Sequence, residues 1–132
     1  MINREIIRIK IVQLTYAYYQ NGNKNIDTAE KELFFSLSKA YDLYNYLLAL
    51  MVAVAKEAKR RLEIAESKAR REGTEKPSAR FAFNRFTLPV EENRQLSEFI
   101  GNQKHTWADE PEFVGKLFEQ IEQSQIYKDY MA

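Results

Sequence analysis

Residues 28–72 decide the fold: they read TAEKELFFSLSKAYDLYNYLLALMVAVAKEAKRRLEIAESKARRE and contain neither proline nor glycine. Asp27 precedes the stretch and Glu30 follows three residues later, the spacing of a capping box that satisfies the first free amides of a helix. At about 1.5 Å per residue, a continuous helix here would be roughly 67 Å long. The sequence therefore predicts one long helix over about 28–72, with Asp27 at its N-cap.

The two halves of this stretch differ in character. Large apolar residues occupy several sides of the first half, whereas residues 56–72 alternate basic and acidic side chains with small or isolated apolar ones. Mixed charges at helical spacing are typical of a helix surrounded by water. We therefore expect a core helix followed by a solvated arm. The large apolar residues of the first half include Leu33, Phe34, Leu37, Tyr41, Tyr44, Leu47, Leu48, Met51 and Val54.

Composition points to the same fold class. The chain has 132 residues, of which 45% are hydrophobic, with only 4 glycines and 3 prolines. Scarce helix breakers favour an all-α fold over a sandwich or barrel. We expect a single helical domain over 1–132, a bundle built around the long helix with four or five helices in total.

Charge and cysteine content narrow the function. The formal net charge is +1, so no overall field attracts nucleic acid, and any basic site must come from local clustering. The absence of cysteine excludes a disulfide framework and a thiolate metal site and suits the cytoplasm. The most hydrophobic run, 43–55, is shorter than the roughly 20 residues that a membrane span needs.

Upstream of the long helix, the sequence predicts a first helix over Arg4–Gln20 with Asn3 as its N-cap. Its isoleucines would also permit a strand. Arg4 and Arg8 share one helical face, however, and the polar residues do not alternate at period two, so helix is favoured. The run Asn21-Gly22-Asn23 is expected to end it.

Downstream, residues 73–79 read as an exposed linker, since they are charged and rich in turn formers. Three phenylalanines then follow in an extended segment, and we expect all three to insert into the core: Phe81, Phe83 and Phe86. A third helix is expected with Pro89 in its first turn and Thr87 or Leu88 before it, and it should run to about Asn102.

The final third of the chain contains two more predicted helices. Trp107 is interpreted as a hydrophobic staple or a core anchor, with an exposed stacking platform for a nucleobase as the alternative. Asp109 is expected to cap a fourth helix with Pro111 in its first turn. A short last helix from Ser124 would place Ile126 and Tyr127 against the bundle.

Residues for catalysis are scarce. With one histidine, His105, and no cysteine, most acid–base and nucleophilic constellations are excluded. Nucleophile-elbow glycines, a phosphate-binding loop and metal-ligand spacing are also missing. Paired carboxylates such as Glu91-Glu92 lie at predicted helix starts, where capping explains them. We therefore expect no enzymatic activity, no cofactor and no metal.

Two basic features remain. Arg4, Arg8 and Lys10 on the first helix could bind phosphates, or form a solvated face opposite the isoleucines. The second feature is the basic half of the long helix, where interleaved glutamates favour a solvated surface over a binding stripe.

Several stretches of the chain resemble a known protein family. Residues 4–18, REIIRIKIVQLTYAY, resemble the opening helix of the NusB transcription antitermination factors, and the rest is similar to long NusB forms that carry an extra N-terminal region. The ordered set of matching pieces spans nearly the whole chain: DTAEKEL at 27–33, SKAYDLY at 38–44, NRF at 84–86, PEFV at 111–114 and IYKDY at 126–130.

The resemblance implies an all-helical, non-enzymatic RNA-binding factor. NusB proteins pair with NusE, a small-subunit ribosomal protein, and bind the boxA element of nascent RNA, so that RNA polymerase reads through terminators. Only Arg4 and Arg8 match the family's RNA-binding arginines. Long forms place a second helical half after such a region, so we expect this chain to be the N-terminal part of a longer NusB-like protein.

Two hypotheses follow. In the first, Arg4, Arg8 and Lys10 bind boxA-type RNA while Tyr41, Tyr44 and Leu48 bind a protein partner. In the second, the chain is a structural interaction or dimerisation module without RNA affinity of its own, and its apolar faces cover a second copy or a missing C-terminal half. No membrane association is expected in either case.

Overall fold

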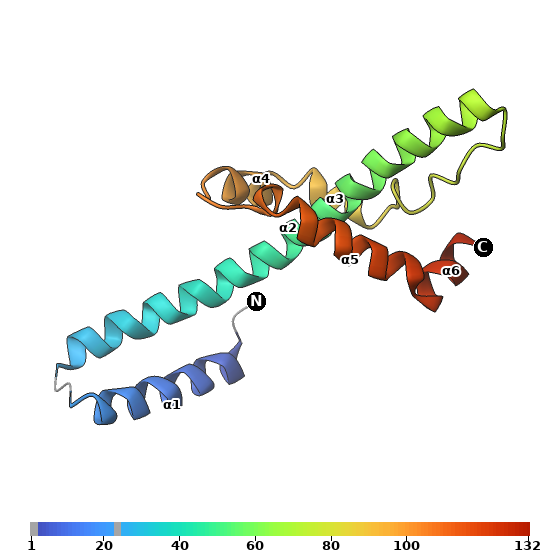
Figure 1. The fold of residues 1–132 in the computed structure, drawn as a ribbon. Coiled ribbons are helices and arrows are strands. Elements are labelled where there is room, and N and C mark those ends of the chain that lie inside the picture. The colour runs from blue at the N-terminus through green and yellow to red at the C-terminus, as the bar shows by residue number, and fades with distance from the viewer. Residues whose placement is uncertain (1–2, 23–24) are drawn as a thin grey trace. The chain divides into compact units, whose positions relative to one another are not determined.

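The computed structural model describes residues 3–22 and 25–132, which form helices joined by turns and loops (Figure 1). No strand occurs in these residues, so the prediction of an all-α fold is confirmed. The elements in chain order are α1 (Arg4–Gln20), α2 (Ile26–Glu72), α3 (Thr87–Glu91), α4 (Arg94–Gly101), the 3-10 turn η1 (Trp107–Asp109), α5 (Pro111–Gln123) and α6 (Gln125–Met131).

The predicted bounds and N-cap of α1 are confirmed. The Asn3 side chain accepts a hydrogen bond from the Ile6 amide at 2.9 Å, as an N-cap does. At the other end, the Asn21 amide donates to the Ala17 carbonyl at 2.9 Å, and Gly22 has φ +64°. This left-handed conformation costs glycine little, which is why the helix ends here. Asn23, the third residue of the predicted stop, lies outside the described residues.

The long helix α2 has 47 residues, and its cap differs from the prediction. Asn25 Oδ1 accepts hydrogen bonds from the Asp27 amide at 3.0 Å and the Thr28 amide at 3.4 Å. The prediction of Asp27 as N-cap is therefore wrong, because the asparagine two residues earlier supplies the acceptor. Asp27 instead lies in the first turn, where a negative charge suits the helix dipole.

The chain divides into two compact units that meet at Asn45 and Tyr46, so α2 contributes to both. In the first unit, α1 and residues 26–45 of α2 run in opposite directions (Figure 1). The half-buried side chains on α1 follow helical spacing, but none is buried. The first unit therefore has little core of its own. Its half-buried apolar residues include Ile6, Leu14 and Tyr18 on α1, and Leu33, Leu37 and Ala40 on α2.

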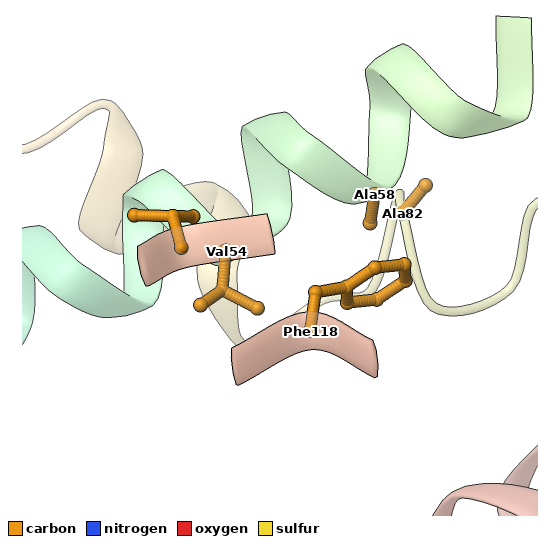
Figure 2. Close-up of a cluster of buried hydrophobic side chains, with 5 residues drawn as sticks. Val54, Ala58, Ala82 and Phe118 are labelled. Carbon is orange, nitrogen blue, oxygen red and sulfur yellow. The ribbon is translucent and has the colours of Figure 1, made fainter. Parts of the chain in front are cut away.

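The second unit contains a hydrophobic core. Figure 2 shows the Phe118 ring of α5 directed toward Ala58 of α2 and Ala82 of the segment before α3. Val54 and Val114 complete the buried cluster. Alanines on α2 allow this close approach, because a larger side chain would push the phenylalanine outward.

A second buried cluster joins α2 to α4. It contains Ala49, Val52 and Leu96, and Trp107 packs against it. The indole Nε1 of Trp107 donates to the Tyr46 carbonyl at 2.7 Å, so this ring is a core anchor as predicted.

Only one of the three predicted core phenylalanines is packed. Phe81 lies against Phe118, with ring centroids 5.7 Å apart, whereas Phe83 and Phe86 are exposed. The prediction for Phe83 and Phe86 is therefore wrong. The reason is a turn at Asn84, whose side chain donates to the Phe81 carbonyl at 2.8 Å and accepts from the Phe86 amide at 3.0 Å. The segment is thus folded rather than extended.

The predicted third helix is two helices. Asn93 interrupts it, because its side chain accepts from the Leu96 amide at 2.9 Å and starts α4 afresh. The cap of α5 also differs: Asp109 accepts from the Thr106 amide at 2.9 Å and closes η1 instead. The start of the last helix is confirmed, with Ser124 capping α6.

The segment 73–79 lies partly against the end of α2. Lys76 pairs with Glu66 at 3.0 Å, Pro77 is half-buried, and Ala69 on α2 is buried. One side of the basic half of α2 is therefore covered rather than solvated. The prediction of a solvated arm is therefore wrong for that side of residues 56–72.

Candidate nucleic-acid interface

The outward face of α1 carries an arginine–tyrosine stripe, which we define as Arg4, Arg8, Val12, Tyr16 and Tyr19. All five side chains are exposed. Successive spacings of four, four, four and three residues place them on one side of a helix. Arg4 and Arg8 make no ion pair or hydrogen bond with the residues that the structure describes. Within the described residues, the stripe therefore presents two guanidinium groups without an ion pair or hydrogen bond, on the same helical face as two exposed tyrosine rings.

Lys10 does not belong to this stripe. It is half-buried and falls on the same side of α1 as Ile6 and Leu14. Two residues correspond to about 200° of rotation, so Lys10 lies about 160° around the helix from Arg8. The structure therefore separates Lys10 from the two arginines with which sequence reasoning grouped it.

Tyr16 and Tyr19 are site residues that sequence reasoning missed. Their side chains are 68% and 77% exposed. An aromatic ring on a basic face can stack on an unpaired base while arginines bind the backbone phosphates. The signal in the sequence is the helical spacing that continues from Arg4 and Arg8 through Val12 to Tyr16 and Tyr19. Glu5, also exposed, lies beside the arginines and offsets part of their charge.

The predicted partner-binding residues divide between the two units. In the first unit, Tyr41 and Tyr44 are exposed, and their rings stack with centroids 6.5 Å apart. In the second unit, Leu48 packs against the Ala49–Val52–Leu96 cluster. Leu48 is therefore committed to internal packing, whereas the two tyrosines stay accessible.

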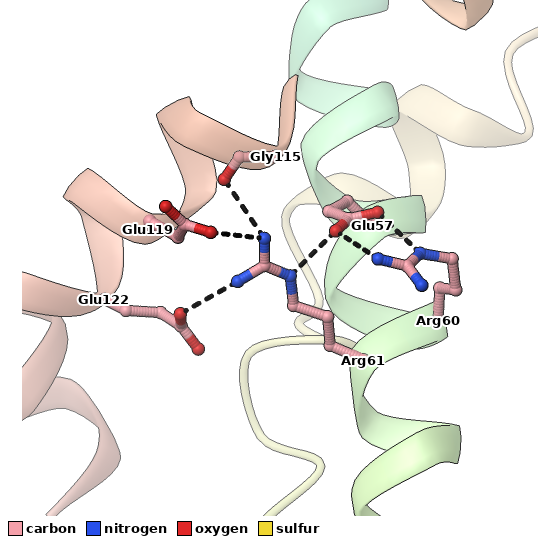
Figure 3. A network of polar contacts seen from close by, with 6 residues as sticks. All are labelled: Glu57, Arg60, Arg61, Gly115, Glu119 and Glu122. Atoms are coloured by element: carbon pink, nitrogen blue, oxygen red, sulfur yellow. Dashed lines mark hydrogen bonds and ion pairs between the residues drawn. The ribbon is translucent and has the colours of Figure 1, made fainter. Parts of the chain in front are cut away.

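Two arginines in the basic half of α2, Arg60 and Arg61, form hydrogen bonds with other residues of the protein. Figure 3 shows the Arg61 guanidinium between two helices, donating to Glu57 on α2 and, on α5, to the Gly115 carbonyl and to Glu119 and Glu122. Arg60 donates to the same Glu57 carboxylate at 2.8 and 2.9 Å. These bonds, Arg60 first, hold the pKa of Glu57 at about 2 although burial opposes the shift. These two arginines are therefore unavailable as a phosphate-binding stripe.

Few side chains in the described residues are arranged for acid–base catalysis or for metal binding. His105 is exposed, and its Nδ1 lies 3.9 Å from Asp109 Oδ2. Across 3–22 and 25–132, histidine, cysteine, aspartate and glutamate side chains do not gather in groups of three or more that could hold a metal. Within the same ranges, no helix combines the length and apolar character that crossing a membrane requires.

Comparison of the chain with protein-family models, with curated proteins and with solved structures found no match. The candidate interface therefore depends on the geometry of α1 and on the sequence resemblance.

Proposed function

We propose that the protein is a non-catalytic, NusB-like transcription factor domain that binds boxA-type RNA through the arginine–tyrosine stripe of α1. The observation that carries this proposal is that one helical face combines two exposed tyrosines with two arginines that make no ion pair or hydrogen bond in residues 3–22 and 25–132. Guanidinium groups bind phosphate oxygens in a bidentate manner, and tyrosine rings stack on unpaired bases. Single-stranded RNA offers both groups.

Two phosphate contacts give modest affinity. With two neutralised phosphates, log K for a single strand falls with log salt at a slope of about −1.4. Stacking on two tyrosines adds about 1–3 kcal/mol for each base. Binding of this strength benefits from a second contact, and the resemblance supplies one in NusE and the RNA polymerase complex. The exposed Tyr41 and Tyr44 are the candidate residues for a protein contact.

The test is fluorescence anisotropy with a labelled boxA-type RNA at low and moderate salt. We expect the variant Arg4→Ala/Arg8→Ala to lose about ten-fold or more in affinity and to flatten the salt dependence. Tyr16→Ala/Tyr19→Ala should weaken binding without changing the salt slope.

A matched control is Arg94→Ala/Lys116→Ala, which removes the same charge from two exposed cations of the second unit that pair with Glu98 and Glu112. This control should bind RNA like the unchanged protein. RNA binding that survives the loss of both α1 arginines would remove the proposed role of the stripe.

The rival function is a dimerisation or interaction module without RNA affinity. It is favoured by the apolar surface of the first unit, where α1 has no buried residue and several large side chains of α2 are exposed. Sedimentation velocity over a wide concentration range tests it, with Tyr41→Glu/Tyr44→Glu as the disrupting variant. The exposed side chains are Ile26, Phe34, Phe35, Tyr41, Leu43 and Tyr44.

A further inference from the structure

The second unit contains a pocket that the proposed RNA contact does not use, and we call it the Trp107 pocket. Its volume is about 310 Å³. Three helices, α2, α4 and α5, contribute to its lining together with the turn η1. Its deepest part is apolar, because Ala49, Val52 and Val114 line it and are buried. A cavity of about 150 Å³ holds a benzene ring, so the Trp107 pocket has room for an apolar group of about two rings.

The side-chain hydrogen-bond acceptors around this pocket already receive bonds from the protein. Both oxygens of Glu57 accept from arginines of α2, as Figure 3 shows. The side-chain oxygen of Gln103 accepts from the Tyr46 hydroxyl at 3.2 Å. The Thr106 hydroxyl oxygen accepts from the Ala108 amide at 3.3 Å. A ligand with a cationic group or N–H donors would therefore compete with bonds that the fold already makes.

Two donors at the pocket have no such partner in the part of the chain that the structure describes. Lys56 is exposed, and its ammonium makes no ion pair or hydrogen bond there. Arg60 donates through Nε and Nη2 to Glu57, and its Nη1 makes no bond with the described residues. Two cations and one carboxylate thus line the pocket, which leaves one positive charge in excess. Available donors and excess positive charge favour a ligand with a single negative charge.

We infer that the Trp107 pocket binds a small carboxylate with a compact apolar body, which would lie against α2 while its carboxylate pairs with Lys56. The combination of an apolar cavity and an available ammonium group selects this class of ligand. Lys128 is equally exposed and also makes no ion pair or hydrogen bond in residues 3–22 and 25–132, but it does not line this pocket. It therefore provides a comparison for the role of Lys56.

The experiment uses the fluorescence of Trp107, which is the single tryptophan of the chain and lines the pocket. The probes are adamantane-1-carboxylate and 1-adamantylamine, which share one apolar body and differ in the sign of their charge. Ligands of this size bind with a Kd on the order of 1 mM, so the full chain is titrated to tens of millimolar at constant ionic strength. We expect the carboxylate to bind about ten-fold more tightly than the amine.

The first variant tests the charge contact. Lys56→Gln removes the ammonium from an exposed side chain, so the fold should be unchanged. It should weaken binding of the carboxylate about five-fold or more and should not weaken binding of the amine. Lys128→Gln is the matched control, and this variant should bind both probes like the unchanged protein.

A second variant tests the apolar part of the site. Ala53 is half-buried and lines the pocket, so Ala53→Leu would fill part of its volume and should weaken both probes about ten-fold. The matched control is Ala65→Leu, the same substitution at an exposed alanine of α2 outside this pocket, which should bind like the unchanged protein. Circular dichroism verifies that each variant is helical.

Three results would overturn the inference: no saturable binding of the carboxylate, equal affinity for the two probes, or equal effects of Lys56→Gln and Lys128→Gln. A dimer that Ala53→Leu dissociates in sedimentation velocity would also overturn it, because a second copy would then fill the pocket. None of these variants changes α1, so RNA binding and carboxylate binding can fail independently of each other.

Discussion

Arg61 Nε lies 2.7 Å from Glu57 Oε1 one turn earlier on α2, and the same guanidinium also reaches α5. One side chain therefore joins the long helix to the helix that supplies Phe118 to the core. Glu57 has little exposed surface and accepts from both Arg60 and Arg61. Two predictions follow from this pair of residues.

The first prediction compares the two arginines. Arg61→Met keeps the aliphatic stem and removes the donors, so the free energy of unfolding should fall by about 1–3 kcal/mol. Arg60→Met removes a more exposed partner of the same carboxylate and should cost clearly less. Urea unfolding followed by circular dichroism measures both. Equal losses in the two variants would contradict the role of Arg61 as the link to α5.

The second prediction concerns the stability of the protein at low pH. The pKa of Glu57 is lowered from 4.5 to about 2 in the folded protein. The ionised carboxylate therefore stabilises the fold above the ordinary pKa, and this stabilisation is lost as pH falls from 4.5 toward 2. Glu57→Gln should be less stable at neutral pH and should lose less stability on acidification. Urea unfolding at several pH values checks it. Parallel pH profiles for the two proteins would refute it.

The third prediction uses one substitution at two phenylalanines. Phe118 is 3% exposed and Phe86 is 71% exposed. Phe118→Ala opens a cavity between α2 and α5 and should destabilise the protein by about 3–5 kcal/mol. Phe86→Ala should change stability by less than about 0.5 kcal/mol, since it removes a surface side chain. Thermal or urea unfolding measures the stability of both variants. A large loss for Phe86→Ala would contradict the exposed position of this side chain.

The fourth prediction concerns the single tryptophan. Trp107→Phe keeps an aromatic ring near Phe113, whose centroid is 5.6 Å away, but removes the hydrogen bond to the Tyr46 carbonyl. We expect a loss of about 1 kcal/mol. Trp107→Ala should cost about 3 kcal/mol or more, because the ring itself packs against the α2–α4 cluster. Similar losses in the two variants would place the stabilisation in the hydrogen bond rather than in packing.

The confirmed predictions are those that depend on residues close together in the sequence. The bounds of α1, the single long helix and the start of the last helix at Ser124 all follow from residues within a few positions of each other. Two predicted caps were wrong because other local hydrogen bonds form: Asn25 accepts from the Asp27 and Thr28 amides and starts α2 earlier, and Asp109 accepts from the Thr106 amide in η1 while α5 begins without a side-chain cap bond. Short polar side chains make such alternatives close in free energy.

Features that join distant segments could not be predicted. Asn84 forms a turn that leaves Phe86 exposed, and no periodicity in the sequence predicts this turn. The Trp107 pocket draws its lining from α2, α4, η1 and α5, so only the folded chain reveals it. In the candidate interface, the shared face of Arg4 and Arg8 could be predicted from their spacing, whereas the exposure of Tyr16 and Tyr19 required the structure.

Because the boundary between the two units lies inside α2, the two parts of this helix should differ in their local free energy of unfolding. Residues 46–72 are held by buried contacts, whereas residues 26–45 depend on α1 and bury almost nothing. A helix of about 20 residues with few neighbours is marginal by itself in water. Amide hydrogens at the start of α2 should therefore exchange with deuterium much faster than those in its middle, although the hydrogen-bond ladder is continuous. The segment that exchanges fastest would then be the one that a binding partner orders.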